Sequence, residues 1–486
     1  MILLIILLTP LITGLFLLIV RNVAIVRLLA LAATVVNLLV TFSMVFTFSA
    51  TKAVVNPMNM LGFQFSLGYD GISLIMILLT NLLFPFIILA GFNQNQKQVS
   101  LLNFLILFTQ TALIGVFLAQ SGFLFYIFWE LALIPVFFIL LLWGGENRRI
   151  ITLKFFIYTL AGSLLLLFGI IYLSQLSAGD HTTDFLVFGK LKIPENTQIW
   201  LFWILFIAFA IKMPVFPFHT WQPATYTMAS TQGVMILAGV MTKMGVYGAL
   251  RFLFPIVPLG VLYWQNTVII LCLIGVIYAS IIAFRQTNLK RLIAFSSMSH
   301  ISLIAAAIFV FNSYAFQGLL FQTLSHGVVI VALLYLAHLI EARTNTLDLS
   351  QMGGIKLKAP NLAILLLIVT LGSIALPLTS GFVGEFLILT GLFKQSAWFA
   401  FFGGTAMILS AIYMLYAYQR IMLGNLKAGF EKITDIRFPD YLILIPLIIV
   451  ILVLGMYPQP VFNLLKESVT TMQSLLIPVT DLVFQK

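Results

Sequence analysis

The sequence predicts an all-α integral membrane protein of about fourteen transmembrane helices. Hydrophobic residues make up 62% of the 486 residues and charged residues only 8%, which is too few to cover a water-facing surface. Apolar runs of about 18 residues or more recur along the whole chain, and each can cross a hydrocarbon core of about 30 Å as a helix. Because the runs are solidly apolar, without the alternating pattern of a membrane β-barrel, they favour helices.

Charged residues, prolines, glycines and asparagines bound the fourteen expected helices. The first run lacks the basic segment of a signal peptide, so we expect it to remain as a helix. The seventh and twelfth runs contain prolines, and we expect these two helices to be broken. The tail from residue 458 mixes apolar and polar residues, which predicts a short surface helix. In chain order the expected helices are 2–20, 25–48, 71–92, 101–119, 123–143, 152–176, 199–220, 231–253, 267–284, 291–311, 315–341, 361–391, 397–422 and 441–457.

Lys and Arg residues are distributed unevenly between the two sides of this arrangement. Sixteen of them follow odd-numbered helices and seven lie on the opposite side, Lys52 and Lys486 among them. Because basic loops stay in the cytoplasm, both termini are expected on the outer side. The net charge of +11 thus reflects topology, since no basic run of the kind that binds nucleic acid appears. A phosphate-binding loop and paired cysteines are also absent from the sequence, so we expect the chain itself to bind no cofactor.

Four ionisable residues lie inside the expected helices. Such a side chain costs at least about 2.5–3.5 kcal/mol at mid-bilayer, so each is a candidate for function. In one interpretation they form structural ion pairs that lock the packing, although an isolated buried pair gains little over apolar packing. In the other they form a proton pathway, which needs groups whose protonation is controlled by burial and by neighbouring charges. The four are Glu130, Lys212, Lys243 and Glu385.

The helices that carry these charges contain helix-breaking residues. Pro214 and Pro217 follow Lys212, and Pro377 precedes Glu385. In lipid a broken helix is tolerated only against protein or a wet cavity. Broken helices at corresponding places in two halves of a chain are typical of the sites of transporters built from repeats. The seventh and twelfth helices fit this pattern.

Histidines add candidates for a proton relay, because histidine titrates nearest to physiological pH. His219, His300 and His326 lie within or at the edges of apolar helices. A polar stripe begins near Lys290 and continues through two serines to His300. For each histidine, an ordinary packing or hydrogen-bonding role remains an alternative.

Several motifs together resemble the antiporter-like membrane subunits of respiratory complex I, the NADH:quinone oxidoreductase. In order they are WELALIP, KMPVFPFHTW, TKMGVYG, QTNLKRLIAFSSMSH, QTLSHG and SGFVGEF, and the resemblance covers about residues 70 to 425. In that family a glutamate in the twelfth helix is typical of the M-type subunit, which is subunit 4 in mitochondria, whereas related subunits usually carry lysine. Glu385 therefore resembles the M-type.

The resemblance implies a fold of two inverted five-helix repeats, helices 4–8 and helices 9–13. The corresponding domains are 1–95 for helices 1–3, 96–258 for the first repeat, 259–425 for the second, and 426–486 for helix 14 and the tail. The loop after helix seven departs from the family pattern, because Ala224, Tyr226 and Ser230 replace an acid, a histidine and a proline. The resemblance therefore does not support a role for that loop in proton entry.

The resemblance also implies roles for the buried residues. Glu130 would modulate the charge of Lys212, Lys243 would connect two half-channels, and Glu385 would be the terminal proton site. His300 and His326 would be polar residues of the central axis. His219 and Lys290 are the remaining relay candidates.

We therefore expect a proton-translocating membrane-arm subunit, driven by electron transfer in other subunits. NADH, FMN, iron–sulfur clusters and quinone would belong to those partners. We expect L-type and N-type subunits and lipids to surround the chain, and we do not expect the chain to function alone. The expected location is the inner membrane of a bacterium. The alternatives are a subunit of a multi-subunit sodium/proton antiporter, a subunit of a related hydrogenase or ferredoxin-dependent complex, and a purely structural scaffold.

Overall fold

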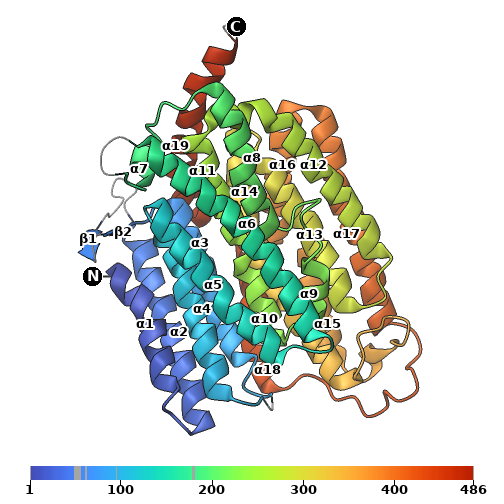
Figure 1. Cartoon of the computed structure of the whole chain (residues 1–486). Coiled ribbons are helices and arrows are strands. Elements are labelled where there is room, and N and C mark those ends of the chain that lie inside the picture. The colour runs from blue at the N-terminus through green and yellow to red at the C-terminus, as the bar shows by residue number, and fades with distance from the viewer. Residues whose placement is uncertain (1, 49–55, 61–62, 95, 178–180, 485–486) are drawn as a thin grey trace.

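Long helices lying roughly side by side make up the protein (Figure 1). The computed structural model describes residues 2–48, 56–60, 63–94, 96–177 and 181–484. Within these ranges the only strands pair in one small antiparallel hairpin, so the all-α prediction is confirmed for the membrane-spanning part. A helix satisfies its own backbone hydrogen bonds, which lipid cannot do, and this explains why the apolar runs all fold as helices.

The elements have the following bounds. They are α1 (Ile2–Leu17), α2 (Val23–Phe46), β1 (Asn56–Met60), β2 (Phe63–Leu67), α3 (Gly71–Leu89), α4 (Val99–Leu118), α5 (Gly122–Trp143), α6 (Arg148–Leu176), α7 (Phe185–Phe188), α8 (Glu195–Lys212), α9 (Gln222–Met228), α10 (Thr231–Ile236), the π-helix η1 (Leu237–Met241), α11 (Lys243–Ile256), α12 (Pro258–Phe284), α13 (Leu289–Ile308), α14 (Ser313–Thr344), the 3₁₀-helix η2 (Ile355–Leu357), α15 (Pro360–Ser373), α16 (Ser380–Gln395), α17 (Ala397–Met422), α18 (Phe438–Met456) and α19 (Gln459–Phe484).

Eleven of the described helical segments are long and apolar enough to cross a membrane. They correspond to the expected helices 2–6, 8–11, 13 and 14, with α10, η1 and α11 counted as one segment. The other three expected helices are α1, which has 16 residues, and the two that were predicted to be broken. The prediction of about fourteen spans is confirmed.

Both broken helices are broken where prolines stand. The seventh expected helix ends as α8 at Lys212, and helical structure resumes in α9 at Gln222. The twelfth divides into α15 and α16. Pro214 and Pro377 lie in the two gaps, where the missing N–H of proline interrupts the hydrogen-bond ladder. The sequence prediction placed both breaks correctly, although it drew each helix as one range.

The most enclosed helices lie at the centre of the bundle. The apolar segments of Thr231–Ile256 and Ser313–Thr344 are 100% buried inside the protein and that of α13 is 94% buried, whereas those of α2 and α17 are 28% buried. Polar side chains on the enclosed helices are therefore shielded from lipid.

Several features of the connections and of the tail were not predicted from the sequence. The hairpin β1–β2 and the short helix α7 lie between spans. The tail forms the 26-residue helix α19, so the prediction of a short surface helix was wrong in its length. Val461, Leu465 and Val469 repeat every four residues and are buried, and α19 packs with this apolar stripe against α3 and α14. The mixed composition of the tail reflects an amphipathic helix.

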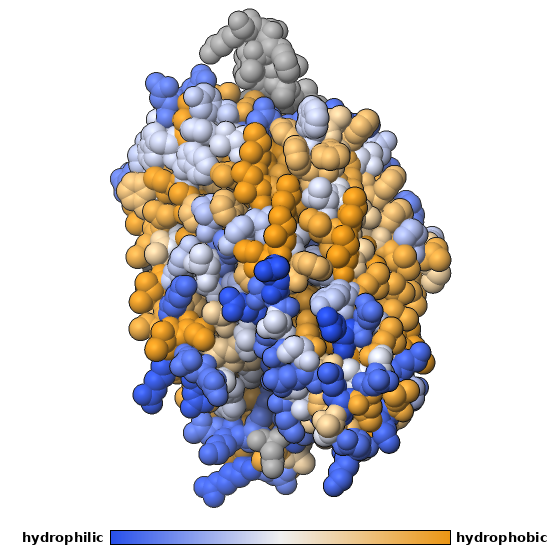
Figure 2. Space-filling view, turned by 90° about the vertical axis from the view of Figure 1, so that its right-hand side faces the viewer, coloured by the Kyte–Doolittle hydropathy of each residue, from blue (hydrophilic) through white to orange (hydrophobic). Residues whose placement is uncertain are grey.

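Hydrophilic residues gather at the lower end of the molecule in Figure 2, below a region where hydrophobic residues predominate. The connections α1–α2, α5–α6 and α17–α18, which contain basic residues, lie at this end in Figure 1. Lys52 and Lys486, which entered the count for the opposite side, lie outside the described residues. Which compartment the basic end faces stays a prediction.

Candidate proton-transfer site

Glu130 and Lys212 lie on neighbouring parts of α5 and α8. Lys212 is 3% exposed, and its Nζ lies 5.0 Å from the centre of the Trp129 ring. An ammonium group in this position is attracted by the ring face. The carboxylate of Glu130 also attracts it, although no ion pair within 4.0 Å joins the two in the described structure. A small movement of either helix can therefore change how strongly Glu130 acts on Lys212.

The open end of α8 is closed by hydrogen bonds from the chain that follows it. The indole N–H of Trp221 donates to the carbonyl of Ile211 over 2.9 Å, and the amide of Val215 donates to the carbonyl of Ala210 over 3.0 Å. A buried carbonyl without a partner costs several kcal/mol in a membrane. These bonds stabilise the break and keep Lys212 at its edge.

Lys243 lies at the start of α11, directly after the π-helix η1, and is 1% exposed. Its Nζ donates to the carbonyl of Ala238, which belongs to the widened turn of η1. Nζ also lies 3.3 Å from Oγ1 of Thr242 and 3.0 Å from Nδ1 of His326 on α14. Single π-turns occur often at functional sites, and here the turn supplies an acceptor for a buried ammonium.

Two glycines allow η1 and α14 to approach closely. A Cβ atom added at Gly327 would lie only 2.9 Å from the carbonyl oxygen of Gly239. Gly327 follows His326 and Gly239 follows Ala238, so this contact lies beside the Lys243–His326 hydrogen bond. Small residues at helix interfaces serve the same purpose in membrane proteins generally.

His326, His300 and Glu385 continue from Lys243 on three further helices. The ring centres of His326 and His300 are 6.0 Å apart, and Nδ1 of His300 lies 2.6 Å from Oε1 of Glu385. None of the three residues is more than 5% exposed. We name Lys243, His326, His300 and Glu385 together the buried line.

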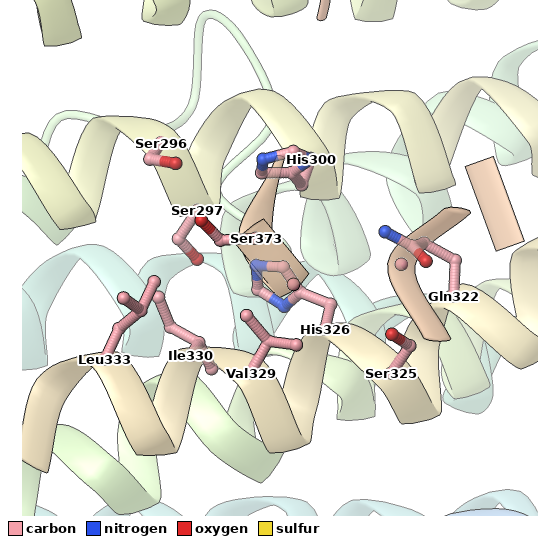
Figure 3. Close-up of a pocket in the computed structure, with 12 residues that line it drawn as sticks. Ser296, Ser297, His300, Gln322, Ser325, His326, Val329, Ile330, Leu333 and Ser373 are labelled. Carbon is pink, nitrogen blue, oxygen red and sulfur yellow. The ribbon is translucent and has the colours of Figure 1, made fainter. Parts of the chain in front are cut away.

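A cavity of about 20 Å³, enough for about one water molecule, adjoins the middle of the buried line. Figure 3 shows the side chains of α13 facing those of α14 across it. Oγ of Ser297 and Nε2 of both His300 and His326 are buried without a hydrogen-bond partner in the described part of the protein. A polar cavity of this kind can hold water, which can bridge groups that do not touch. The polar lining residues are Ser296, Ser297, His300, Gln322, Ser325, His326 and Ser373.

Lys290 lies in the first turn of α13, apart from the buried line. Its Nζ forms an ion pair of 2.7 Å with Oε2 of Glu341 on α14. The lysine side chain is 6% exposed and the glutamate side chain 41%, so the pair connects the interior with the surface. The expected helix began at residue 291, so Lys290 was counted with the loop before it; this was wrong, because Lys290 is buried within α13. His300 lies ten residues further along α13, about 15 Å along the helix axis.

His219 lies in the break between α8 and α9. Its ring packs against Tyr278 at 5.2 Å and Phe216 at 5.9 Å between centres. Within the described residues no hydrogen bond or ring contact joins it to the buried line. The structure therefore brings four of the eight candidates together in one line and places Glu130 and Lys212 near each other outside it, while His219 and Lys290 lie apart.

Sequence reasoning missed two residues that contact candidates. Gln322 donates from Nε2 to Oε1 of Glu385 over 3.0 Å, and Glu341 pairs with Lys290. Gln322 stands four residues before His326, one helical turn away on the same face, and this spacing could have indicated it. Glu341 was the last residue of an expected helix and looked like an ordinary boundary charge.

A multi-pass bundle with a lysine and histidines buried on its central helices, and a buried glutamate in contact with them, is typical of a membrane protein of the transporter type. The chain belongs to the family of NADH:quinone oxidoreductase/Mrp antiporter membrane subunits, whose model matches residues 119–412.

Named relatives cover most of the chain. NADH-quinone oxidoreductase subunit M of Rhodobacter capsulatus is 36% identical over 90% of this chain and 89% of that protein. NADH-ubiquinone oxidoreductase chain 4 of Arabidopsis thaliana is 34% identical over 96% of this chain and 95% of that protein. A chain of respiratory complex I from Thermus thermophilus superposes with a TM-score of 0.90 at 28% identity, covering 98% of this chain and 100% of that one. A chain of the Mrp complex from Dietzia sp. shares the fold, with a TM-score of 0.87 at 18% identity over 98% of this chain and 99% of that chain.

Proposed function

We propose that this chain is the M-type, proton-translocating membrane-arm subunit of an NADH:quinone oxidoreductase. The relatives named above support the enzyme and the subunit type. The observation that carries the proposal in the structure is the buried line. Three of its four titratable groups lie on enclosed helices, and the fourth, Glu385, is itself 1% exposed, so each can hold and release a proton without contact with lipid.

The geometry supports a sequence of proton transfers. Glu130 controls the charge of Lys212 by its distance from the ammonium group. Lys243 releases a proton to Nδ1 of His326, and water in the cavity carries it on to His300. Nδ1 of His300 then delivers the proton to Oε1 of Glu385, which exchanges it with the outer compartment. His219 and Lys290 lie outside this sequence. The Lys290–Glu341 pair reaches the surface through Glu341, whose side chain is 41% exposed.

Partner subunits supply the energy for these transfers. They hold the NADH, FMN, iron–sulfur clusters and quinone, and electron transfer among them drives the charges in this chain. L-type and N-type subunits lie beside it in the membrane arm, against apolar side faces such as the one that exposes Trp398 and Phe401. The membrane is the inner membrane of a bacterium, with both termini on the outer side, and residues 96–258 and 259–425 form the two inverted repeats.

Purification of the intact complex tests the proposal. Mass spectrometry should identify peripheral redox subunits, and NADH oxidation in reconstituted vesicles should quench a pH-sensitive dye. Glu385→Gln, which cannot titrate, should lower the proton yield per NADH, whereas Glu385→Lys restores a titratable group and should retain part of it. A complex without redox subunits, or acidification that needs sodium and not NADH, would show instead that the chain belongs to an antiporter.

A further inference from the structure

One oxygen of Glu385 receives both of the hydrogen bonds that the protein offers to this carboxylate. Oε1 lies 2.6 Å from Nδ1 of His300 and 3.0 Å from Nε2 of Gln322. Oε2 is buried and has no hydrogen-bond partner among the residues that the structure describes. The two oxygens of the same carboxylate therefore have different surroundings.

Close helix packing holds Gln322 in place. A Cβ atom added at Gly384, the residue before Glu385, would lie 2.4 Å from Oε1 of Gln322 and 2.8 Å from its Cα. One turn earlier on α14, a Cβ at Gly318 would lie 2.7 Å from the backbone nitrogen of Ile388 on α16. The side chain of Gln322 thus rests on the backbone of α16, and its amide has little room to move away from Glu385.

An amide suits this position for a chemical reason. The opposite orientation of the Gln322 amide would bring its oxygen against a carboxylate oxygen, so the N–H group faces Glu385. An amide N–H stabilises the carboxylate by a hydrogen bond but does not exchange protons at physiological pH. Gln322 can therefore orient Glu385 without becoming a member of the relay.

We propose that Gln322 is a positioning residue that holds Oε1 of the ionised Glu385 against Nδ1 of His300 for proton transfer between them. This inference rests on the proposed function. Gln322 and His300 together fix Oε1 toward the buried line, where the proton passes between Nδ1 of His300 and Oε1. Once the proton is on Oε1 the carboxyl group is neutral and both hydrogen bonds weaken, so the group can turn about its terminal torsion and carry the proton away from His300 toward the other compartment.

Loss of this orientation has a definite consequence. Without the Gln322 bond the ionised carboxylate can rotate about its terminal torsion, which is broad in glutamate. Oε1 is then less often aligned with Nδ1 of His300, so fewer protons pass from His300 to Glu385 in each turnover. The complex would continue to oxidise NADH but would move fewer protons for each NADH.

Three substitutions in the intact complex test the proposal in reconstituted vesicles. Gln322→Leu keeps the approximate volume and removes the donor. Thr323→Val is the matched control, because Thr323 is buried on the same helix and its hydroxyl donates only to the carbonyl of Leu319. Gln322→Glu supplies a donor only while the new carboxyl group is protonated, and when ionised it repels Glu385. The other titratable groups that act on Glu385 are His300 on α13 and Tyr413 on α17.

We expect Gln322→Leu to lower the proton yield per NADH by about twofold or more, with NADH oxidation within about twofold of the native rate. The infrared carboxyl band of Glu385, assigned with Glu385→Gln, should shift in Gln322→Leu and stay unchanged in Thr323→Val. Gln322→Glu should pump with near-native yield at acidic pH and lose yield as the pH rises. A structural role alone would not produce this pH profile.

The outcomes separate the two proposals. If the native complex pumps and the Gln322→Leu complex has the native proton yield and an unchanged carboxyl band, the positioning role is overturned but the proposed function is not. If Gln322→Leu fails to assemble, Gln322→Glu decides, because a yield independent of pH overturns the role and a yield lost at high pH supports it. A native complex that moves no protons overturns the proposed function and this inference with it.

Discussion

Gly327→Ala should impair proton transfer although it changes no titratable group. The added Cβ would lie 2.7 Å from a methyl carbon of Leu79 and 2.9 Å from the carbonyl oxygen of Gly239, whereas ordinary contacts begin at 3.4 Å. The leucine can rotate away, but the carbonyl belongs to the backbone of η1. Relief therefore requires η1 and α14 to separate by about 0.5 Å, at a cost of about 1–3 kcal/mol for overpacking.

This separation acts directly on the buried line. The distance from Nζ of Lys243 to Nδ1 of His326 would increase from 3.0 Å to about 3.5 Å, where a hydrogen bond is largely lost. An increase of about 1.4 kcal/mol in the barrier lowers the rate of this step about tenfold. Dye quenching during NADH oxidation by vesicles containing the intact complex measures the effect, and the NADH oxidation rate with a protonophore shows whether the complex remains assembled.

Two other glycines provide controls for the same substitution. Gly404→Ala places its Cβ where nothing lies within 4 Å, so pumping should remain native. Gly239→Ala first meets side-chain methyl groups of Val331 and Leu83, with the nearest backbone atom at 3.9 Å, and should have a small effect. If Gly327→Ala pumps as well as Gly404→Ala, the close approach of the two helices does not determine proton transfer and this reasoning fails.

The remaining predictions concern other parts of the chain. Lys212→Ala should leave the complex assembled and abolish or severely reduce pumping, because it removes the base beside the first helix break; an assembled variant that pumps normally would exclude the role of Lys212. A reporter fused after Lys486 should be accessible from the outer face and one inserted near Arg149 from the inner face, and finding both on one side would contradict the topology. Burial raises the pKa of Asp70, but the charge and hydrogen bond of Arg251 at 2.5 Å outweigh this and leave its pKa below the ordinary value of 3.8. The stabilisation from this pair is therefore present above about pH 4 and is lost as the pH falls through the lowered pKa. Asp70→Asn should remove this acid-dependent part of the thermal stability. An acid dependence that stays unchanged in Asp70→Asn would refute the assignment.

The sequence predicted the features that depend on local chemistry. A run of apolar residues must form a helix in lipid, and a charge within such a run is too costly to be accidental, so the spans and Glu130, Lys212, Lys243 and Glu385 could be recognised without a structure. Proline beside two of these charges also located the breaks, because the missing N–H is a property of the residue itself.

Contacts between distant segments could not be predicted in the same way. The Glu385–His300 contact joins residues 85 positions apart, and the Lys243–His326 contact joins residues 83 apart. Nothing in the local pattern states which faces of α11, α13, α14 and α16 meet. The π-turn before Lys243 was also invisible, because its residues Leu237–Met241 are ordinary apolar residues that fit an α-helix equally well. His219 shows that a local motif can also mislead: it lies in the KMPVFPFHTW segment, but the structure places it apart from the buried line.

The broken seventh helix also has a consequence for how the chain enters the membrane during synthesis. A continuous apolar helix can leave the translocon sideways into lipid on its own, because its backbone is already satisfied. The end of α8 cannot, since its carbonyl groups are satisfied by Trp221 and Val215, which are made after it. This span must wait beside the insertion machinery until the following residues have emerged and folded back. Ribosome pausing or a membrane chaperone at this stage of translation would therefore affect the yield of this protein more than that of a membrane protein built only from continuous helices.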